Sequence, residues 1–183
     1  MLLNIIQSLY ERAKTASEIA KECNFNQKSV ANHLNKLEKD SILVTRTQGK
    51  NKLFFFNNQL LTFHFLCSIE HQKTIRFYQQ HPTIKQFVTK LPNEGMLILF
   101  GSYAKDEQKT TSDIDLLHIN KKQSNFSELA RKYSVNVDVK HFKELTNNPL
   151  TREVIQHHII LNGVESFVRA IWNDLVGVKK GLN

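Results

Sequence analysis

A short apolar run that ends in a glycine constrains this chain more than any other feature of its sequence. Residues 96–100 read Met-Leu-Ile-Leu-Phe, and Gly101-Ser102 follow at once. Such a continuous run is typical of a strand buried on both faces. A glycine directly after it allows a sharp turn and lets backbone N–H groups approach a ligand closely. We therefore expect a buried strand followed by a phosphate cradle, to which the Ser102 hydroxyl adds one donor.

Three carboxylates follow on two further strand patterns. In Asp-Ile-Asp-Leu-Leu at 113–117, Asp113 and Asp115 share one face because side chains alternate along a strand. Neighbouring carboxylates repel unless a cation lies between them, and Mg²⁺ prefers hard oxygen ligands. The run Val-Asn-Val-Asp-Val at 135–139 adds Asp138 from another strand, as a metal ligand and a proton acceptor for an incoming hydroxyl. The pattern predicts a two-metal Mg²⁺ site with ions about 3.5–4 Å apart.

These motifs resemble the nucleotidyltransferase superfamily that includes DNA polymerase beta, and most of all its small prokaryotic branch, the minimal nucleotidyltransferases. The resemblance covers roughly residues 83–183. It is carried by three motifs: Gly101-Ser102-Tyr-Ala104-Lys105, Ser112-Asp113-Ile-Asp115-Leu116, and Asp138. It implies transfer of a nucleotidyl group, AMP from ATP or another NTP, to a hydroxyl acceptor with release of pyrophosphate. By analogy, the acceptor is a partner protein of the HEPN type.

The resemblance also implies roles for single residues. Gly101 and Ser102 bind the triphosphate, while Asp113, Asp115 and Asp138 bind Mg²⁺ and form the catalytic centre. Lys105 follows the glycine turn and is assigned to nucleotide binding, although a solvated loop lysine is an equal alternative.

One position departs from the family pattern. A glycine is common where this chain has Asp106. A non-glycine residue disfavours positive φ, and a further carboxylate near a triphosphate opposes its binding. Asp106 either points to solvent or weakens activity. A DNA-binding regulator whose nucleotidyltransferase-like domain senses nucleotide or is inactive therefore remains an alternative.

Residues 1–57 predict three helices and a hairpin. A capping box, Thr15-x-x-Glu18, opens the second helix, and Asn26 is the expected N-cap of the third. The hairpin spans 42–56 with a polar turn at 48–51. This order resembles winged helix-turn-helix regulators of the ArsR and MarR kind. Duplex DNA binding is predicted for Gln27, Lys28, Asn32 and Lys36 of the third helix and Arg46, Lys50 and Lys52 of the hairpin. A protein-contact role for the same fold is the alternative.

The charge of the chain agrees with a polyanionic partner. Its formal net charge is +8, and residues 1–80 carry 11 Lys and Arg against 6 Asp and Glu. The start of the chain lacks the basic region of a signal peptide, and no apolar run is long enough to span a membrane. With only two cysteines, the chain is expected to be cytoplasmic.

We predict an α/β (α+β) chain with two domains. A winged helix-turn-helix at 1–57 and a long helix at 58–81 precede a small mixed-sheet nucleotidyltransferase domain at 82–183. The long helix is rich in apolar residues, so it packs between the domains or forms a homodimer. Another helix is expected over 150–161, with His157 and His158 at its surface or in a cap.

Overall fold

The computed structural model describes residues 1–91, 94–121, 126–146 and 148–176. Two compact units form the chain: Met1–Ile69 together with the segment from Val168 onward, and Glu70–Phe167. The limit between them falls inside one helix, α4 (Leu60–Gln80). Domain limits at residues 57 and 81 remain a proposal. Among the described residues, no helix has both the length and the apolar character needed to cross a membrane.

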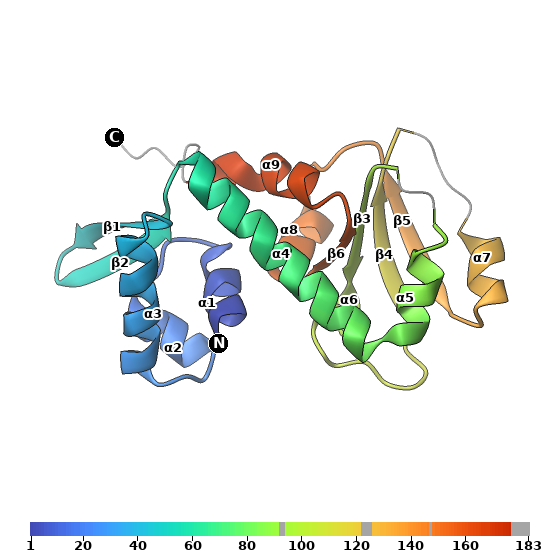
Figure 1. The fold of residues 1–183 in the computed structure, drawn as a ribbon, viewed down its shortest axis with the longest axis horizontal. Coiled ribbons are helices and arrows are strands. Elements are labelled where there is room, and N and C mark those ends of the chain that lie inside the picture. Colours follow the sequence, from blue (N-terminus) through green and yellow to red (C-terminus); the bar gives the residue numbers. More distant parts are fainter. Residues whose placement is uncertain (92–93, 122–125, 147, 177–183) are drawn as a thin grey trace. The chain divides into compact units, whose positions relative to one another are not determined.

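The first unit contains the predicted order of three helices and a hairpin (Figure 1): α1 (Leu2–Leu9), α2 (Ala16–Glu22), α3 (Gln27–Lys39), β1 (Leu43–Gln48) and β2 (Asn51–Phe56). The capping box is confirmed, since the Thr15 hydroxyl accepts from the Glu18 N–H at 3.2 Å and the Glu18 carboxylate accepts from the Thr15 N–H at 2.7 Å. Asn26 caps α3 by accepting from the backbone of Lys28 and Ser29. Local side-chain to backbone bonds therefore fix where both helices begin.

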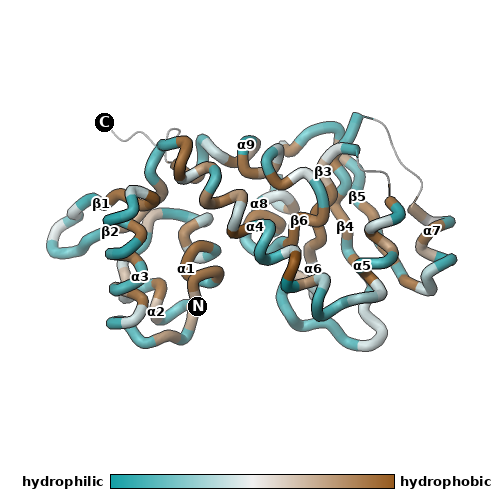
Figure 2. The backbone as a smooth tube through the Cα atoms, viewed as in Figure 1, coloured by the Kyte–Doolittle hydropathy of each residue, from teal (hydrophilic) through white to brown (hydrophobic). Residues whose placement is uncertain are grey.

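The apolar side chains of the hairpin pack into the core of the first unit, and its turn is exposed to solvent. Phe54 and Phe56 of β2 are buried, as are Val30 and Leu34 of α3. The strands are antiparallel and joined at Gly49, whose φ of 61° a glycine adopts without strain. Figure 2 shows the tip as hydrophilic.

The second unit is built on a mixed four-stranded sheet, as predicted. Its strands are β3 (Met96–Phe100), β4 (Ile114–Ile119), β5 (Val137–Phe142) and β6 (Ile159–Asn162). Their order is β5-β4-β3-β6, with β3 antiparallel to both neighbours and β4 parallel to β5 (Figure 1). The short helix α6 (Gly101–Ala104) follows β3 directly.

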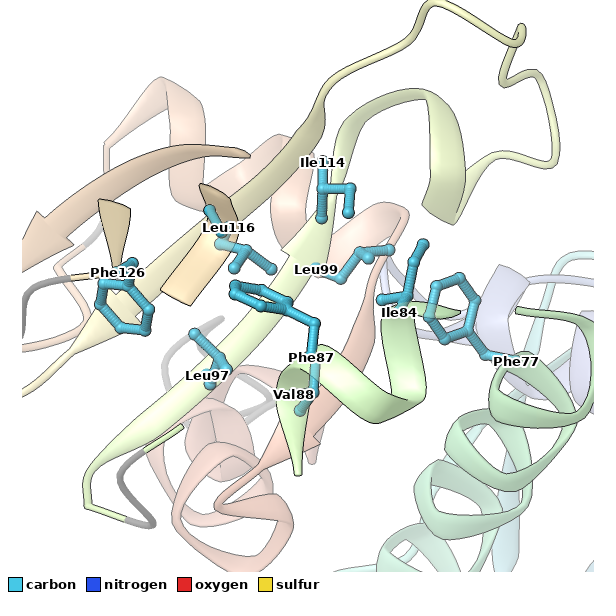
Figure 3. Packing of buried hydrophobic residues seen from close by; sticks show 10 residues of the cluster. Phe77, Ile84, Phe87, Val88, Leu97, Leu99, Ile114, Leu116 and Phe126 are labelled. Carbon is cyan, nitrogen blue, oxygen red and sulfur yellow. The ribbon is translucent and has the colours of Figure 1, made fainter. Parts of the chain in front are cut away.

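One face of this sheet is covered by α5 (Pro82–Val88) and α7 (Ser127–Lys132). Phe87 of α5 is fully buried and belongs to one cluster with Leu97, Leu99 and Leu116 (Figure 3). The opposite face carries Asp115 together with the buried residues Ile98 and Leu117. His118 lies on the covered face, as its strand position predicts.

The predicted helix over 150–161 is wrong in its second half. Helix α8 (Pro149–Gln156) ends five residues before the predicted limit of 161. Strand β6 follows it and pairs with β3 at the edge of the sheet, and helix α9 (Val164–Leu175) comes after β6. The β-branched pair Ile159-Ile160 fits a pleated strand better than a helix end.

The surface alternative is wrong for His158, because its side chain is fully buried, but the cap alternative is confirmed: His157 is the C-cap of α8, and Nδ1 of His158 lies 3.0 Å from the backbone oxygen of Val154. The Nε2 of His158 lies 3.1 Å from a carboxylate oxygen of Glu70, and the Lys73 ammonium lies 2.8 Å from the same oxygen. Burial opposes the ionised form, but the charges of Lys73 and His158 hold the pKa of Glu70 below its usual range. This cluster joins α4 to the end of α8 inside the second unit.

Candidate active site

The glycine after β3 is required by what lies beside it. Gly101 has a φ of 69°, and a Cβ built on it would overlap the carboxylate of Asp115. The cause is the register of β3 and β4, which pairs Phe100 with Asp115. The predicted cradle and the predicted carboxylates are thus brought to one end of the sheet.

The register of β4 and β5 brings the carboxylates together. Asp115 pairs with Asp138 on the neighbouring parallel strand, so both side chains share one face. Asp113 lies one residue before β4 and is exposed. Burial and the negative charges of Asp138 and Asp113 raise the pKa of Asp115. The three residues predicted from sequence therefore form one electrostatically coupled group.

Lys140 offsets the negative charge of this group, whereas Lys105 is paired with a glutamate of α8. Lys140 lies on the same face of β5 as Asp138, and its ammonium is 2.9 Å from the Asp138 carboxylate. Lys105 is 2.9 Å from the carboxylate of Glu153 on α8. Alternation along the strand could have identified Lys140. Glu153 carries no such signal, since it lies 48 residues from Lys105 in the chain.

The carboxylate oxygens of the three aspartates are suitable ligands for Mg²⁺, but the side chains are not arranged around a common point. In the described ranges, no three His, Cys, Asp or Glu side chains are grouped so as to hold a metal ion as they stand. The Asp138 carboxylate is engaged with the ammonium of Lys140. Carboxylate oxygens are the ligands that Mg²⁺ prefers, and a cation would offset the charges of Asp138 and Asp113 which, after burial, raise the pKa of Asp115. Asp113, Asp115 and Asp138 would hold it once Asp138 leaves Lys140.

Asp106 does adopt the backbone conformation for which a glycine is common. Its φ is 58° and its side chain is exposed. Aspartate is among the non-glycine residues that tolerate this region best, so the departure changes the backbone little. In the following turn the Ser112 hydroxyl accepts from the Lys109 N–H at 2.9 Å, which fixes the approach to Asp113.

The residues predicted to bind DNA do not all share one surface. Gln27, Lys28, Asn32 and Lys36 are exposed on α3, and the last three follow at four-residue intervals along one stripe. Lys50 lies at the exposed hairpin turn.

Arg46 and Lys52 lie on opposite faces of the hairpin. The Lys52 ammonium is 2.6 Å from the carboxylate of Glu38 on α3, and the Thr45 hydroxyl donates to the same group. Arg46 instead lines a hollow of about 940 Å³ within the first unit, together with Tyr10 and Leu53. None of the predicted catalytic residues lines this hollow.

Comparison with known proteins agrees with both halves of this description. Residues 82–166 match the family described as "Polymerase beta, Nucleotidyltransferase", and residues 3–43 match "Bacterial regulatory protein, arsR family". A protein of Methanocaldococcus jannaschii named "Putative protein adenylyltransferase" is 33% identical over an alignment of 88 residues, which covers 43% of this chain and 70% of that protein. A solved structure described as "Crystal structure of the toxin-antitoxin with AMP-PNP" is 19% identical with a TM-score of 0.40, over 55% of this chain and 87% of that one. From the family match and the archaeal relative, the chain is a nucleotidyltransferase of the polymerase beta family, with an arsR-type helix-turn-helix segment in front.

Proposed function

We propose that this chain transfers AMP from ATP to a hydroxyl group of a partner protein and needs Mg²⁺ to do so. The observation that carries the proposal is the pairing of Asp115 on β4 with both neighbouring strands: it lies opposite Phe100 of β3 and opposite Asp138 of β5. That pairing sets Asp115 against Gly101 and in register with Asp138, which supports a shared site. The name of the archaeal relative supports a protein as the acceptor. An acceptor of the HEPN type stays a prediction from resemblance.

In the proposed reaction the chain acts mainly by positioning. The backbone at Gly101 and the hydroxyl of Ser102 hold the triphosphate, and Lys105 balances its charge after leaving Glu153. Asp138 takes the proton of the acceptor hydroxyl, whose oxygen forms a bond to the α-phosphorus as the bond to pyrophosphate breaks. Mg²⁺ held by the three aspartates supplies charge neutralisation at the phosphates.

Two labelled forms of ATP test this proposal. The protein is incubated with cell extract, Mg²⁺ and ATP labelled at the α-phosphate or at the γ-phosphate, and label is counted only above that of the same extract without the protein. We expect only the α-label to enter protein, and we expect EDTA, Asp115→Asn or Asp138→Asn to abolish it. Asp40→Asn, an exposed aspartate of the first unit, is the matched control. Transfer of the γ-label would show phosphoryl transfer instead and would reject the proposal.

A second proposed function is DNA binding through α3. The arsR-family match and the exposed stripe of Lys28, Asn32 and Lys36 support it. Replacing both lysines by alanine should lower the slope of log affinity against log salt by about 2, because about one counterion is released for each lysine–phosphate contact. Arg46→Ala, on the hairpin face away from Lys52, should change the slope less. A protein that binds duplex DNA and ATP but transfers no label would be a nucleotide-sensing regulator.

We also propose a homodimer through α4. Three large apolar residues of this helix are exposed: Leu60 (72%), Leu61 (54%) and Ile75 (57%). Sedimentation that shows only monomer at micromolar concentration would reject the dimer.

A further inference from the structure

Two histidines face each other across the paired strands β4 and β5. The parallel register sets His118 opposite His141, and the Nδ1 atoms of the two rings are 3.3 Å apart. Asp115 and Asp138 pair three residues earlier on the same strands. Since side chains alternate along a strand, the histidines lie on the other face of the sheet from these aspartates. This histidine pair is therefore a cluster of metal-ligating groups that the proposed nucleotidyl transfer does not use.

The contacts of His118 determine which of its ring nitrogens carries a proton. Its Nε2 lies 3.3 Å from the backbone oxygen of Glu94, and because a carbonyl oxygen only accepts, Nε2 is the donor. Burial of the ring lowers the pKa of His118, so the imidazole is neutral at pH 7 and its Nδ1 keeps a lone pair. That lone pair accepts the Nδ1–H of His141. One of the two facing nitrogens is thus already in the form that binds a metal ion.

The surroundings and the spacing of the histidine pair suit a tetrahedral metal ion. A metal-ligating histidine usually donates its other ring N–H to a carboxylate or a backbone carbonyl, as His118 does to Glu94. Two Zn–N bonds of about 2.0–2.1 Å at a tetrahedral angle need nitrogens about 3.3–3.4 Å apart. The two Nδ1 atoms have this spacing. The ring of Phe126 packs edge-on against His118, at 5.0 Å and 78°, and so restrains its orientation.

We propose that the histidine pair binds Zn²⁺ through both Nδ1 atoms. On binding, the proton on Nδ1 of His141 passes to Nε2 of the same ring, so that both Nδ1 lone pairs face the ion. His141 is half-buried, and water completes the coordination, since no group of three His, Cys, Asp or Glu side chains forms in the part of the chain that the structure describes. Imidazole nitrogens suit Zn²⁺, whereas Mg²⁺ prefers oxygen.

Such an ion would act as a clamp between β4 and β5. It would lie about 10 Å along the strands from the pair of Asp115 and Asp138, because three residues separate the two pairs. By joining the strands it would stabilise the register on which the proposed catalytic site depends. The clamp itself does not depend on nucleotidyl transfer.

Calorimetric titration with Zn²⁺ in excess Mg²⁺ tests the proposal, because Mg²⁺ competes for the carboxylates and not for the imidazoles. We compare the wild type with His118→Asn, His141→Asn and, as the matched control, His71→Asn, an exposed histidine of α4. Either exchange in the pair should weaken Zn²⁺ binding at least about tenfold, and His71→Asn should leave it unchanged. Zn²⁺ should also raise the unfolding temperature of the wild type. Thermal unfolding without Zn²⁺ confirms that each variant is folded, and one folded variant of the pair is enough to decide.

The outcomes separate this inference from the proposed function. Zn²⁺ binding that the histidine variants keep and Asp115→Asn loses would place the ion at the carboxylates and overturn the inference. A wild type that binds no Zn²⁺ would overturn it too, and the histidine pair would then be a hydrogen bond alone. Neither result bears on α-label transfer, which tests the proposed function by itself.

Discussion

Gly101 lies so close to the carboxylate of Asp115 that no side chain fits between them. Gly101 follows the end of β3 and Asp115 lies near the start of β4, 14 positions away in the chain. They meet because Phe100 pairs with Asp115. The glycine therefore serves the geometry of the carboxylate as well as the turn itself.

Replacing Gly101 with alanine should displace Asp115 and abolish α-label transfer. The positive φ alone costs about 1–2 kcal/mol of stability for a residue with a Cβ. Gly49 separates the two effects, since its φ is also positive but nothing lies within 4 Å of a Cβ built there. Gly49→Ala should thus cost similar stability and retain transfer, as measured by urea unfolding and the labelling assay. Full activity of Gly101→Ala would contradict the overlap.

Asp115→Asn should stabilise the protein while removing its activity. The pKa of Asp115 is raised by burial and by Asp138 and Asp113, so its ionised form at pH 7 is less favourable in the folded state than in the unfolded state. A neutral isostere relieves this repulsion. Because the side chain is partly exposed, solvent screens the effect, and we expect a gain below about 1 kcal/mol. A lower melting temperature for Asp115→Asn would argue against a strained carboxylate group.

Lys140→Met should tighten binding of Mg²⁺ in the absence of nucleotide. The lysine ammonium neutralises Asp138, and its removal leaves more negative charge for a cation. A unit charge at this range is worth on the order of 1 kcal/mol, or about fivefold in affinity. Calorimetric titration measures this, with Lys143→Met, an exposed lysine just beyond β5, as the control. Equal affinity in both variants would show that Lys140 does not compete with the cation.

Glu70→Ala should destabilise the second unit strongly. The carboxylate is fully buried and faces both Lys73 and His158. Removing one member of a buried ionic cluster costs about 3–5 kcal/mol, because the remaining charge loses its partner. Glu165→Ala, an exposed glutamate at the start of α9, should cost far less in urea unfolding. A loss below 1 kcal/mol for Glu70→Ala, on the order of an exposed pair, would contradict the burial of this cluster.

The capping box of α2 should make the stability of the folded protein depend on pH in the acidic range. Hydrogen bonds from Thr15, aided by Arg12, lower the pKa of Glu18 to about 2. Because the pKa of Glu18 is lower in the folded state, its carboxylate stabilises the folded protein at pH values above the ordinary pKa of 4.5. This contribution is lost as the pH falls from 4.5 toward 2. The difference in melting temperature between the wild type and Glu18→Gln should therefore be largest near pH 6 and shrink on acidification. A difference that does not change with pH would contradict the role of the Glu18 charge.

Local signals predicted most of the fold. The caps at Thr15 and Asn26, the hairpin glycine and the apolar run of β3 act through neighbouring residues, so they can be recognised in sequence. The end of α8 does not follow from the helical spacing of its apolar residues, because the β-branched pair Ile159-Ile160 favours a strand but is too short to decide by itself. Their pairing with β3, more than 50 positions away, decides between the two.

Part of the proposed site could be predicted from the alternation of side chains along a strand. Alternation sets the face of Asp115 and of Asp138, although the register that pairs them follows only from the fold. The partner of Lys105 and the burial of His158 depend on packing between distant helices and loops. The separation of Arg46 from Lys52 could have been foreseen by counting residues in the hairpin.

The pairing of β4 with its two neighbours makes catalytic competence a measure of correct folding. A slip of one residue in β4 would turn Asp115 toward the hydrophobic face and Leu116 toward water, so the misfolded form would lose its core and its site at once. If Asp115 acts as proposed, a sheet folded in the shifted register would not transfer nucleotide. In a preparation, the active fraction therefore counts the molecules whose strands are aligned.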